Sequence, residues 1–207
     1  MLVMQHATGA DQKLLALVKP THEAYCKRHG YEYITDTTSW SSKCFPHWGK
    51  FFVLQKLFKE LPEDTIVLYM DTDAIIVDAT YQLHTIPDGV SHFTMAKNQT
   101  VCYSIMQDGV FFARNTKEVR DFIDLLLAEA VTIPEGSPAF RANYKDEETF
   151  NARYPEHPEI KIQVMDSRFN YYPWISKDLC TMPPVIKAWH GMPMRFKISQ
   201  MPNFCIS

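Results

Sequence analysis

Two aspartates separated by one residue directly follow a run of apolar residues. Residues 65–70 have the continuous apolar character of a central strand that is covered on both faces, and Asp71-Thr72-Asp73 comes next. In an extended chain, side chains two residues apart point to the same side, and α/β proteins bind ligands at the carboxyl ends of strands. Two carboxylates this close repel each other, and a divalent cation relieves the repulsion. The pattern favours a metal site at Asp71 and Asp73 over a solvated turn.

A histidine near the end of the chain could complete this site. His190 ends a late apolar stretch, and Arg195 and Lys197 follow it. One nitrogen ligand among oxygen ligands favours Mn²⁺, with Mg²⁺ as an alternative. Lys197 or Arg195 could neutralise phosphate charge, although both also fit solvated surface cations.

The elements that must position these residues alternate between strands and helices, which predicts an α/β fold. Thr8 belongs to the turn between the first strand and the first helix, which Pro20 should kink or restart and Gly30 should end. Residues 132–144 read as an extended loop, and residues 191–207 show no clear period. The expected strands cover residues 2–4, 31–35, 65–70, 74–77, 92–96, 110–113, 160–165 and 185–189, and the expected helices cover residues 12–29, 48–61, 116–131 and 145–153.

Composition limits the classes of function. A length of 207 residues fits one domain over residues 1–207, and a net charge of −3 argues against a basic surface for nucleic acid. The 5 cysteines are odd in number and scattered, so we expect no disulfide framework and a reducing, cytoplasmic location. The chain starts without a basic signal-peptide region, and its apolar runs stay short of the ~18 residues of a membrane span, so we expect a soluble protein.

Six short motifs follow one another in a fixed order along the chain. They are His29-Gly30-Tyr31, Trp48-Gly49-Lys50, Asp71-Thr72-Asp73, Gln107-Asp108-Gly109-Val110, Asp146-Glu147 with Asn151, and His190-Gly191. These motifs resemble those of GT-A-fold glycosyltransferases, and the pattern is most similar to that of retaining galactosyl- and mannosyltransferases. The resemblance spans most of the chain. It implies an α/β, Rossmann-like GT-A single domain with a mixed, mostly parallel central sheet flanked by helices.

The resemblance implies a hexosyltransferase that moves a sugar from a nucleotide-sugar donor, a UDP-sugar first, to a glycan or protein-linked acceptor with retention. It implies a small enzyme of microbial or viral type, with Mn²⁺ held against the diphosphate. By the same resemblance, Asp71, Asp73 and His190 are the metal ligands, Thr8 borders the nucleotide, Tyr33 stacks on the base, Lys50 faces the donor sugar or the phosphates, and Lys197 meets the phosphates.

Two positions depart from the family motifs. Gln107 replaces an asparagine, and Glu147 replaces a glutamine that lies near the anomeric carbon in retaining members. A glutamate there could act as a nucleophile or stabilise an oxocarbenium ion, and Asp146 shares this candidate catalytic role. Both could equally belong to a solvated helix start, where acidic residues suit the helix dipole. Asp108 is a candidate for binding sugar hydroxyls. An inverting enzyme would use one of these carboxylates as a base.

Other readings stay open at this stage. A haloacid-dehalogenase-like phosphatase would use Asp71 as its nucleophile, but Ala74 and Ile75 follow the motif, which lies far from the start of the chain. A zinc-binding module could use the pairs Cys26/His29 and Cys44/His47, and a non-catalytic nucleotide-sugar-binding protein could keep the transferase fold.

Overall fold

A six-stranded sheet forms the centre of the computed structural model, which describes residues 1–40, 46–97, 106–132, 146–172, 183–189 and 192–201. The strand order is β2-β1-β3-β6-β5-β7. Strand β6 runs antiparallel to β3 and β5, and the remaining neighbours are parallel, so the sheet is mixed and mostly parallel as expected. The strands are β1 (Leu2–His6), β2 (Glu32–Asp36), β3 (Ile66–Met70), β5 (Phe93–Lys97), β6 (Met106–Arg114) and β7 (Ile162–Met165).

A second, two-stranded sheet pairs β4 (Ala74–Ile76) with β8 (Ile186–Ala188) in antiparallel register. Strand β4 begins directly after Asp73, so the Asp-X-Asp segment joins the large sheet to the small one. Its geometry is therefore set by both sheets.

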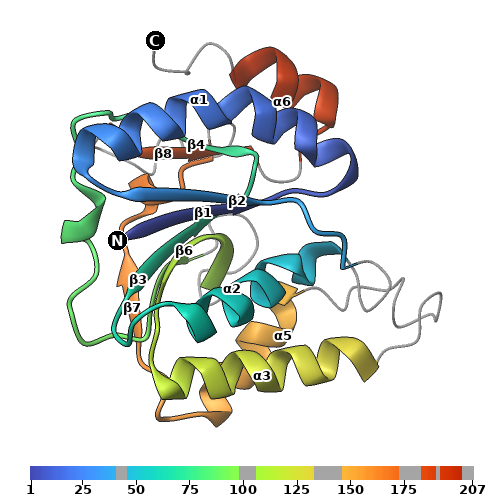
Figure 1. Cartoon of the computed structure of the whole chain (residues 1–207), viewed down its shortest axis with the longest axis vertical. Helices are drawn as coiled ribbons and strands as arrows, with labels where there is room; N and C mark the ends of the chain where they lie inside the picture. Colours follow the sequence, from blue (N-terminus) through green and yellow to red (C-terminus); the bar gives the residue numbers. More distant parts are fainter. Residues whose placement is uncertain (41–45, 98–105, 133–145, 173–182, 190–191, 202–207) are drawn as a thin grey trace.

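Helices cover both faces of the large sheet (Figure 1). One face carries α1, and the other carries α2, α3 and α5, while α6 lies beside α1. Short 3₁₀ turns connect several elements. The helices are α1 (Gln12–His29), α2 (Gly49–Glu60), α3 (Lys117–Thr132), α5 (Asp146–Arg153) and α6 (Met194–Gln200), and the 3₁₀ turns are η1 (Gly9–Asp11), η2 (Pro46–Trp48), η3 (Leu83–Thr85), η4 (Tyr154–Glu156) and η5 (Ser167–Phe169).

The core follows the two-residue period of the strands. On β3, Val67 and Tyr69 pack into the cluster under α2 and α3, whereas Leu68 and Met70 pack into the cluster that contains residues of α1 and β8. Because both faces are covered, the central strands read as continuous apolar runs, which is the pattern that revealed β3 in the sequence.

Two local features differ from what the sequence indicated. Helix α1 continues through Pro20, so the restart that was one of the two expected outcomes does not occur. Pro20 and Ala16, whose carbonyl loses its helical partner, are both exposed, so water can satisfy that carbonyl. Residues 194–200 form α6 although the sequence showed no period there. No residue of α6 is buried, so the helix has no apolar stripe for a periodicity argument to detect.

Thr116 caps the start of α3. The Thr116 hydroxyl accepts from the Val119 N–H at 3.3 Å. Asn115 is buried and instead donates its amide to the carbonyls of Phe58, Leu61 and Pro62 at the end of α2. This side chain fixes α2, which carries Lys50, against the sheet.

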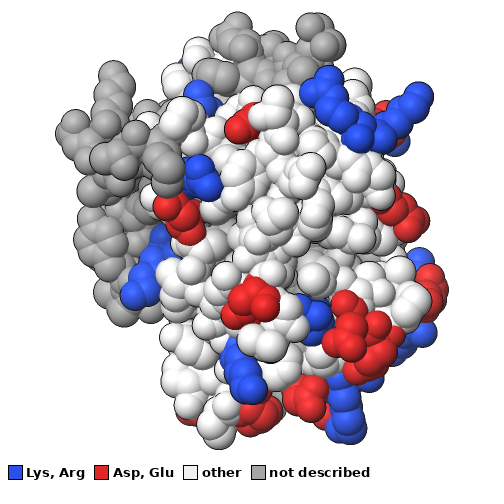
Figure 2. All heavy atoms as spheres, turned by 90° about the vertical axis from the view of Figure 1, so that its left-hand side faces the viewer, with Lys and Arg blue, Asp and Glu red and all other residues white. Residues whose placement is uncertain are grey.

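The face opposite the carboxyl ends of β1 and β3 carries charges of both signs around a largely uncharged centre (Figure 2). No helix among the described residues is long and apolar enough to cross a membrane.

Candidate active site

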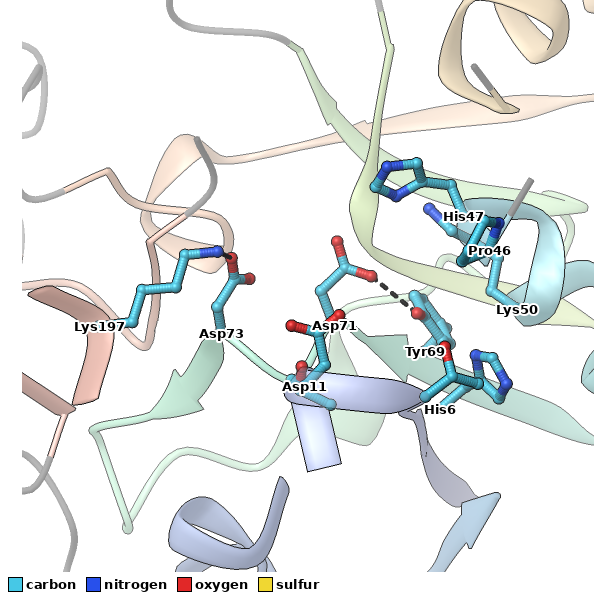
Figure 3. A pocket seen from close by; sticks show the side chains of 11 residues that line it. His6, Asp11, Pro46, His47, Lys50, Tyr69, Asp71, Asp73 and Lys197 are labelled. Carbon is cyan, nitrogen blue, oxygen red and sulfur yellow. Dashed lines mark hydrogen bonds and ion pairs between the residues drawn. The ribbon is translucent and has the colours of Figure 1, made fainter. Parts of the chain in front are cut away.

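A cavity of about 140 Å³ opens at the carboxyl ends of β1 and β3 (Figure 3). Five of the residues predicted from the sequence line it: Thr8, Lys50, Asp71, Asp73 and Lys197. These residues come from positions far apart in the chain, so the fold brings them together. The other lining residues are His6, Asp11, Pro46, His47, Tyr69 and Thr72.

The two aspartates are held by the backbone around them. The Asp71 N–H donates to the Gly109 carbonyl at 2.7 Å, and the Tyr69 hydroxyl donates to Asp71 Oδ1 at 2.7 Å. The Asp73 carbonyl accepts from the Trp189 N–H on the small sheet at 2.9 Å. Burial is the main cause that raises the pKa of Tyr69, and Asp71 raises it further, so this hydroxyl stays a donor.

A cation already lies against Asp73. Lys197 Nζ is 2.5 Å from Asp73 Oδ2, and both side chains are largely buried. Figure 3 shows the lysine side chain meeting Asp73 at one side of the cavity, while the Asp71 carboxylate projects separately beside this pair. The position beside Asp73 therefore accommodates positive charge.

Lys50 forms the centre of a second, buried cluster. Its Nζ lies 3.0 Å from Asp108 Oδ1 and 2.7 Å from Asp146 Oδ2, and it also donates to the Asp108 carbonyl. Burial alone would lower the pKa of Lys50, but Asp108 and Asp146 raise it well above its usual value. Burial and Asp146 raise the pKa of Asp108 well above its usual range, and Lys50 opposes this shift.

Glu147 lies beside this cluster and is half-buried. Gln107 Nε2 donates to Glu147 Oε2 at 2.6 Å, so the two residues that depart from the family motifs contact each other. Two acceptor atoms nearby, Asp108 Oδ2 and Gln107 Oε1, are buried and have no hydrogen-bond partner in the described part of the chain. Neither residue lines the cavity described above.

Asp11 is a third carboxylate on the cavity, and no sequence motif pointed to it. Burial raises the pKa of Asp11, Lys197 lowers it, and Asp73 and Asp71 raise it. Its place between the first strand and α1 made it look like an ordinary helix start. The signal that could have identified it is its position after the carboxyl end of β1, beside the end of β3.

His6 lines the cavity, and its ring lies against Gly49 at the start of α2. His6 Nε2 hydrogen-bonds to the Thr38 carbonyl at 3.0 Å. A Cβ on Gly49 would lie 2.1 Å from His6 Cε1, so the glycine is required by the close approach of this ring.

Two predicted residues stand apart from the cavity. Tyr33 does not line it: its hydroxyl donates to Gln5 Oε1 at 2.6 Å, and its ring packs edge-on against His22. His190 lies outside the described residues.

The described residues alone do not form a complete metal centre. No group of three or more His, Cys, Asp or Glu side chains among them is arranged to hold a metal ion. For the zinc reading, burial raises the pKa of the Cys26 thiol to about 12, which opposes the thiolate that zinc requires, and Cys44 lies outside the described part of the chain.

The mixed sheet, with an Asp-X-Asp segment at the carboxyl end of its central strand, is that of a GT-A-fold glycosyltransferase. The chain belongs to the galactosyl transferase GMA12/MNN10 family, whose sequence profile matches residues 1–108. This membership decides against the phosphatase reading. No curated protein matches the chain.

Solved structures share the fold at low identity. A glycosyltransferase involved in glycosylation of the major capsid of PBCV-1 aligns with a TM-score of 0.73, 14% identity and 97% coverage of both chains. The galactosyltransferase LgtC, in complex with donor and acceptor sugar analogs, aligns with a TM-score of 0.61, 15% identity, and coverage of 92% of this chain and 87% of LgtC. GlyE of Streptococcus pneumoniae aligns with a TM-score of 0.61 and 13% identity, and this chain spans 61% of its length.

Proposed function

We propose that this glycosyltransferase uses a divalent metal, Mn²⁺ or Mg²⁺, to transfer a neutral hexose from a UDP-sugar to a glycan or protein-linked acceptor with retention. Residues 1–207 act as a single domain in this proposal. The observation that carries it is the cavity at the end of β3, which Asp71 and Asp73 both line and where the Lys197 ammonium pairs with Asp73.

The donor set fits a hard divalent cation. Asp71 and Asp73 supply carboxylate oxygens, Asp11 adds negative charge nearby, and the Lys197 ammonium marks a place that holds a cation. His190 is the third proposed ligand. When bound, the metal supplies Lewis-acid stabilisation of the charge that develops on the leaving diphosphate. Lys197, released from Asp73, pairs with the same diphosphate.

The proposed donor is a UDP-sugar. A Drosophila β-1,4-galactosyltransferase 7 mutant, which shares the fold with a TM-score of 0.51 at 10% identity over 91% of this chain and 70% of its own, was solved in complex with manganese, UDP-Gal and xylobiose. Thr8 and His6 border the side of the cavity at the end of β1 and would lie beside the nucleotide.

The proposed sugar is a neutral hexose. Asp108 Oδ2 and Gln107 Oε1 are buried acceptors without a partner among the described residues, and Asp146 and Glu147 add further carboxylate oxygens in the same region. Sugar hydroxyls donate to such oxygens, whereas a carboxylated sugar would bring an opposing charge. Lys50 fixes Asp108 and Asp146 in place for this contact.

Glu147 is the proposed nucleophile. A carboxylate oxygen attacks the anomeric carbon as the bond to the β-phosphate oxygen breaks, and the electron pair of that bond leaves with the diphosphate. The acceptor hydroxyl oxygen then attacks the anomeric carbon, Glu147 leaves as a carboxylate with the electron pair of its bond, and the hydroxyl proton passes to an oxygen of the released diphosphate, so two inversions give net retention. Gln107 orients the carboxylate by donating to Oε2. An active-site glutamine-to-glutamate mutant of LgtC was also solved, and this chain carries Glu147 where the family motif has glutamine.

The role of Glu147 is tested by Glu147→Gln with Glu148→Gln as the matched neighbour. Glu147→Gln should keep Mn²⁺-dependent UDP binding and lose at least 100-fold in turnover, on the order of the loss of a covalent step. Glu148→Gln should retain turnover. NMR of the first-formed product should show the anomeric configuration of the donor. Unchanged turnover in Glu147→Gln would make this residue a surface acid.

The donor class is tested by thermal shift with UDP, GDP, CMP and their sugars, each with Mn²⁺ and with EDTA. A ligand that binds the folded state raises the melting temperature according to its concentration over Kd. A Mn²⁺-dependent shift with UDP and its hexoses supports the proposal. A melting-temperature shift with GDP or CMP alone would mean that the donor is a GDP- or CMP-linked sugar and not a UDP-sugar.

A further inference from the structure

A buried polar network joins the Asp-X-Asp segment to α1. Its side chains are Gln5 on β1, His22 on α1 and Tyr33 on β2, and none of them lines the cavity. Gln5 and His22 are completely buried. Polar side chains in such positions are costly unless every group is satisfied, so their contacts need an explanation.

The hydrogen bonds form a chain that begins at Ile76 and ends at the Asp71 carbonyl, and each group donates to the next. The Ile76 N–H donates to His22 Nε2 at 3.3 Å, and His22 Nδ1 pairs with Gln5 Oε1 at 2.8 Å. The Tyr33 hydroxyl donates to the same oxygen at 2.6 Å. Gln5 Nε2 then donates to the Asp71 carbonyl at 3.1 Å.

These partners leave one consistent set of protonation states. A backbone N–H can only donate, so His22 Nε2 accepts and Nδ1 carries the proton that it donates to Gln5. Burial lowers the pKa of His22 to about 3, so the ring is neutral as this arrangement requires. With two donors at Oε1, the amide of Gln5 has a fixed orientation, and its nitrogen faces Asp71.

The network attaches both ends of the segment that contains the two aspartates. At one end, the Asp71 carbonyl accepts from Gln5 and from the Ala74 N–H, which lies 3.0 Å away. At the other end, Ile76 on β4 is bonded to His22. The path from Asp71 to Ile76 is therefore fixed to β1 and α1, independently of the cavity side chains.

We infer that Gln5 and His22 are positioning residues that set the relative placement of Asp71 and Asp73 for metal binding. The inference rests on the proposed metal role of these aspartates. Residues that orient metal ligands by hydrogen bonds, without touching the metal themselves, typically contribute 10–100-fold to metal affinity. Gln5 acts through the ligand backbone, and His22 acts through Gln5 and β4.

The test measures Mn²⁺ affinity directly, with Mn²⁺ alone as the probe and free Mn²⁺ followed by its electron paramagnetic resonance signal. Gln5→Leu removes the donor to Asp71 and should weaken Mn²⁺ binding by roughly tenfold or more. His22→Gln offers an amide that can both accept and donate, and should bind within about twofold of wild type. Leu126→Ala, a buried change in α3, should lower the melting temperature without changing Mn²⁺ affinity.

Equal Mn²⁺ affinity in wild type and Gln5→Leu would overturn the positioning role while leaving the metal site intact. An equal loss in Leu126→Ala would also overturn it, because general destabilisation would then explain the effect. Absence of Mn²⁺ binding in wild type would remove the proposed metal site itself, which distinguishes the two failures. If Gln5→Leu does not fold, Tyr33→Phe removes one donor to Gln5 and should weaken Mn²⁺ binding about two- to threefold; unchanged affinity would overturn the role.

Discussion

Replacing Lys50 by methionine should destabilise the protein far more than replacing another lysine of the same helix. Lys50 Nζ lies 3.0 Å from Asp108 and 2.7 Å from Asp146, and all three side chains are buried. Removing one partner of a buried ion pair leaves an uncompensated charge and typically costs about 3–5 kcal/mol. Lys56 on the same helix is exposed, so Lys56→Met should change the free energy of unfolding by less than about 0.5 kcal/mol.

The loss of stability in Lys50→Met relative to wild type should become smaller as the pH falls. Burial and Asp146 raise the pKa of Asp108, and Lys50 opposes them, so its removal raises that pKa further. An acid with a raised pKa in the folded state binds its proton more tightly there than in the unfolded state. Acidification therefore stabilises the folded variant, and its deficit relative to wild type shrinks by about 1.4 kcal/mol per pH unit and proton between the pKa of Asp108 in the variant and the lower pKa that Lys50 maintains in wild type.

Urea denaturation of wild type, Lys50→Met and Lys56→Met at pH 7 and pH 5, followed by tryptophan fluorescence, measures both effects. Equal stability of the two lysine variants at pH 7, or a deficit in Lys50→Met that grows on acidification, would refute this reasoning.

The other predictions concern the contact between His6 and Gly49 and the buried ring of His22. Gly49→Ala places a Cβ 2.1 Å from His6 Cε1 and should cost about 1–3 kcal/mol in the free energy of unfolding. In a double-mutant cycle, the double variant with His6→Ala should recover most of that loss. Additive losses of the two single variants would contradict the contact. Burial lowers the pKa of His22 in the folded state to about 3, from an ordinary value of 6.5. Between these two pH values the unfolded state binds more protons than the folded state. The free energy of unfolding should therefore fall by about 1.4 kcal/mol per pH unit on acidification in this range. His22→Gln should remove this contribution from the urea midpoints, and an unaltered pH profile would mean that His22 is not buried as a neutral ring.

The alternation of strands and helices could be predicted because the apolar runs carry it directly. Strand β3 reads as a central strand since both its faces are covered. Strand β6 was predicted at residues 110–113 but begins at Met106, because Gln107 and Asp108 interrupt its apolar run. Those polar residues belong to the Lys50 and Glu147 contacts, so local pattern and function conflict there.

The candidate site could be predicted only in part. Thr8, Lys50, Asp71, Asp73 and Lys197 were selected one motif at a time, and the fold gathers them at one cavity. The ion pairs of Lys50 and the Lys197–Asp73 contact join residues up to 124 positions apart, so no spacing rule could reveal them. Gln5 and His22 were missed for the same reason: each looks like an isolated polar residue in an apolar element until the tertiary contacts are known.

The central claim, a metal-dependent nucleotide site at Asp71 and Asp73, is tested most directly by isothermal titration of UDP into the protein. Wild type should bind UDP with Mn²⁺ and lose at least tenfold in affinity with EDTA, and Asp73→Asn should bind weakly under both conditions. Mn²⁺-independent binding of UDP, or full Mn²⁺-dependent binding by Asp73→Asn, would contradict the account.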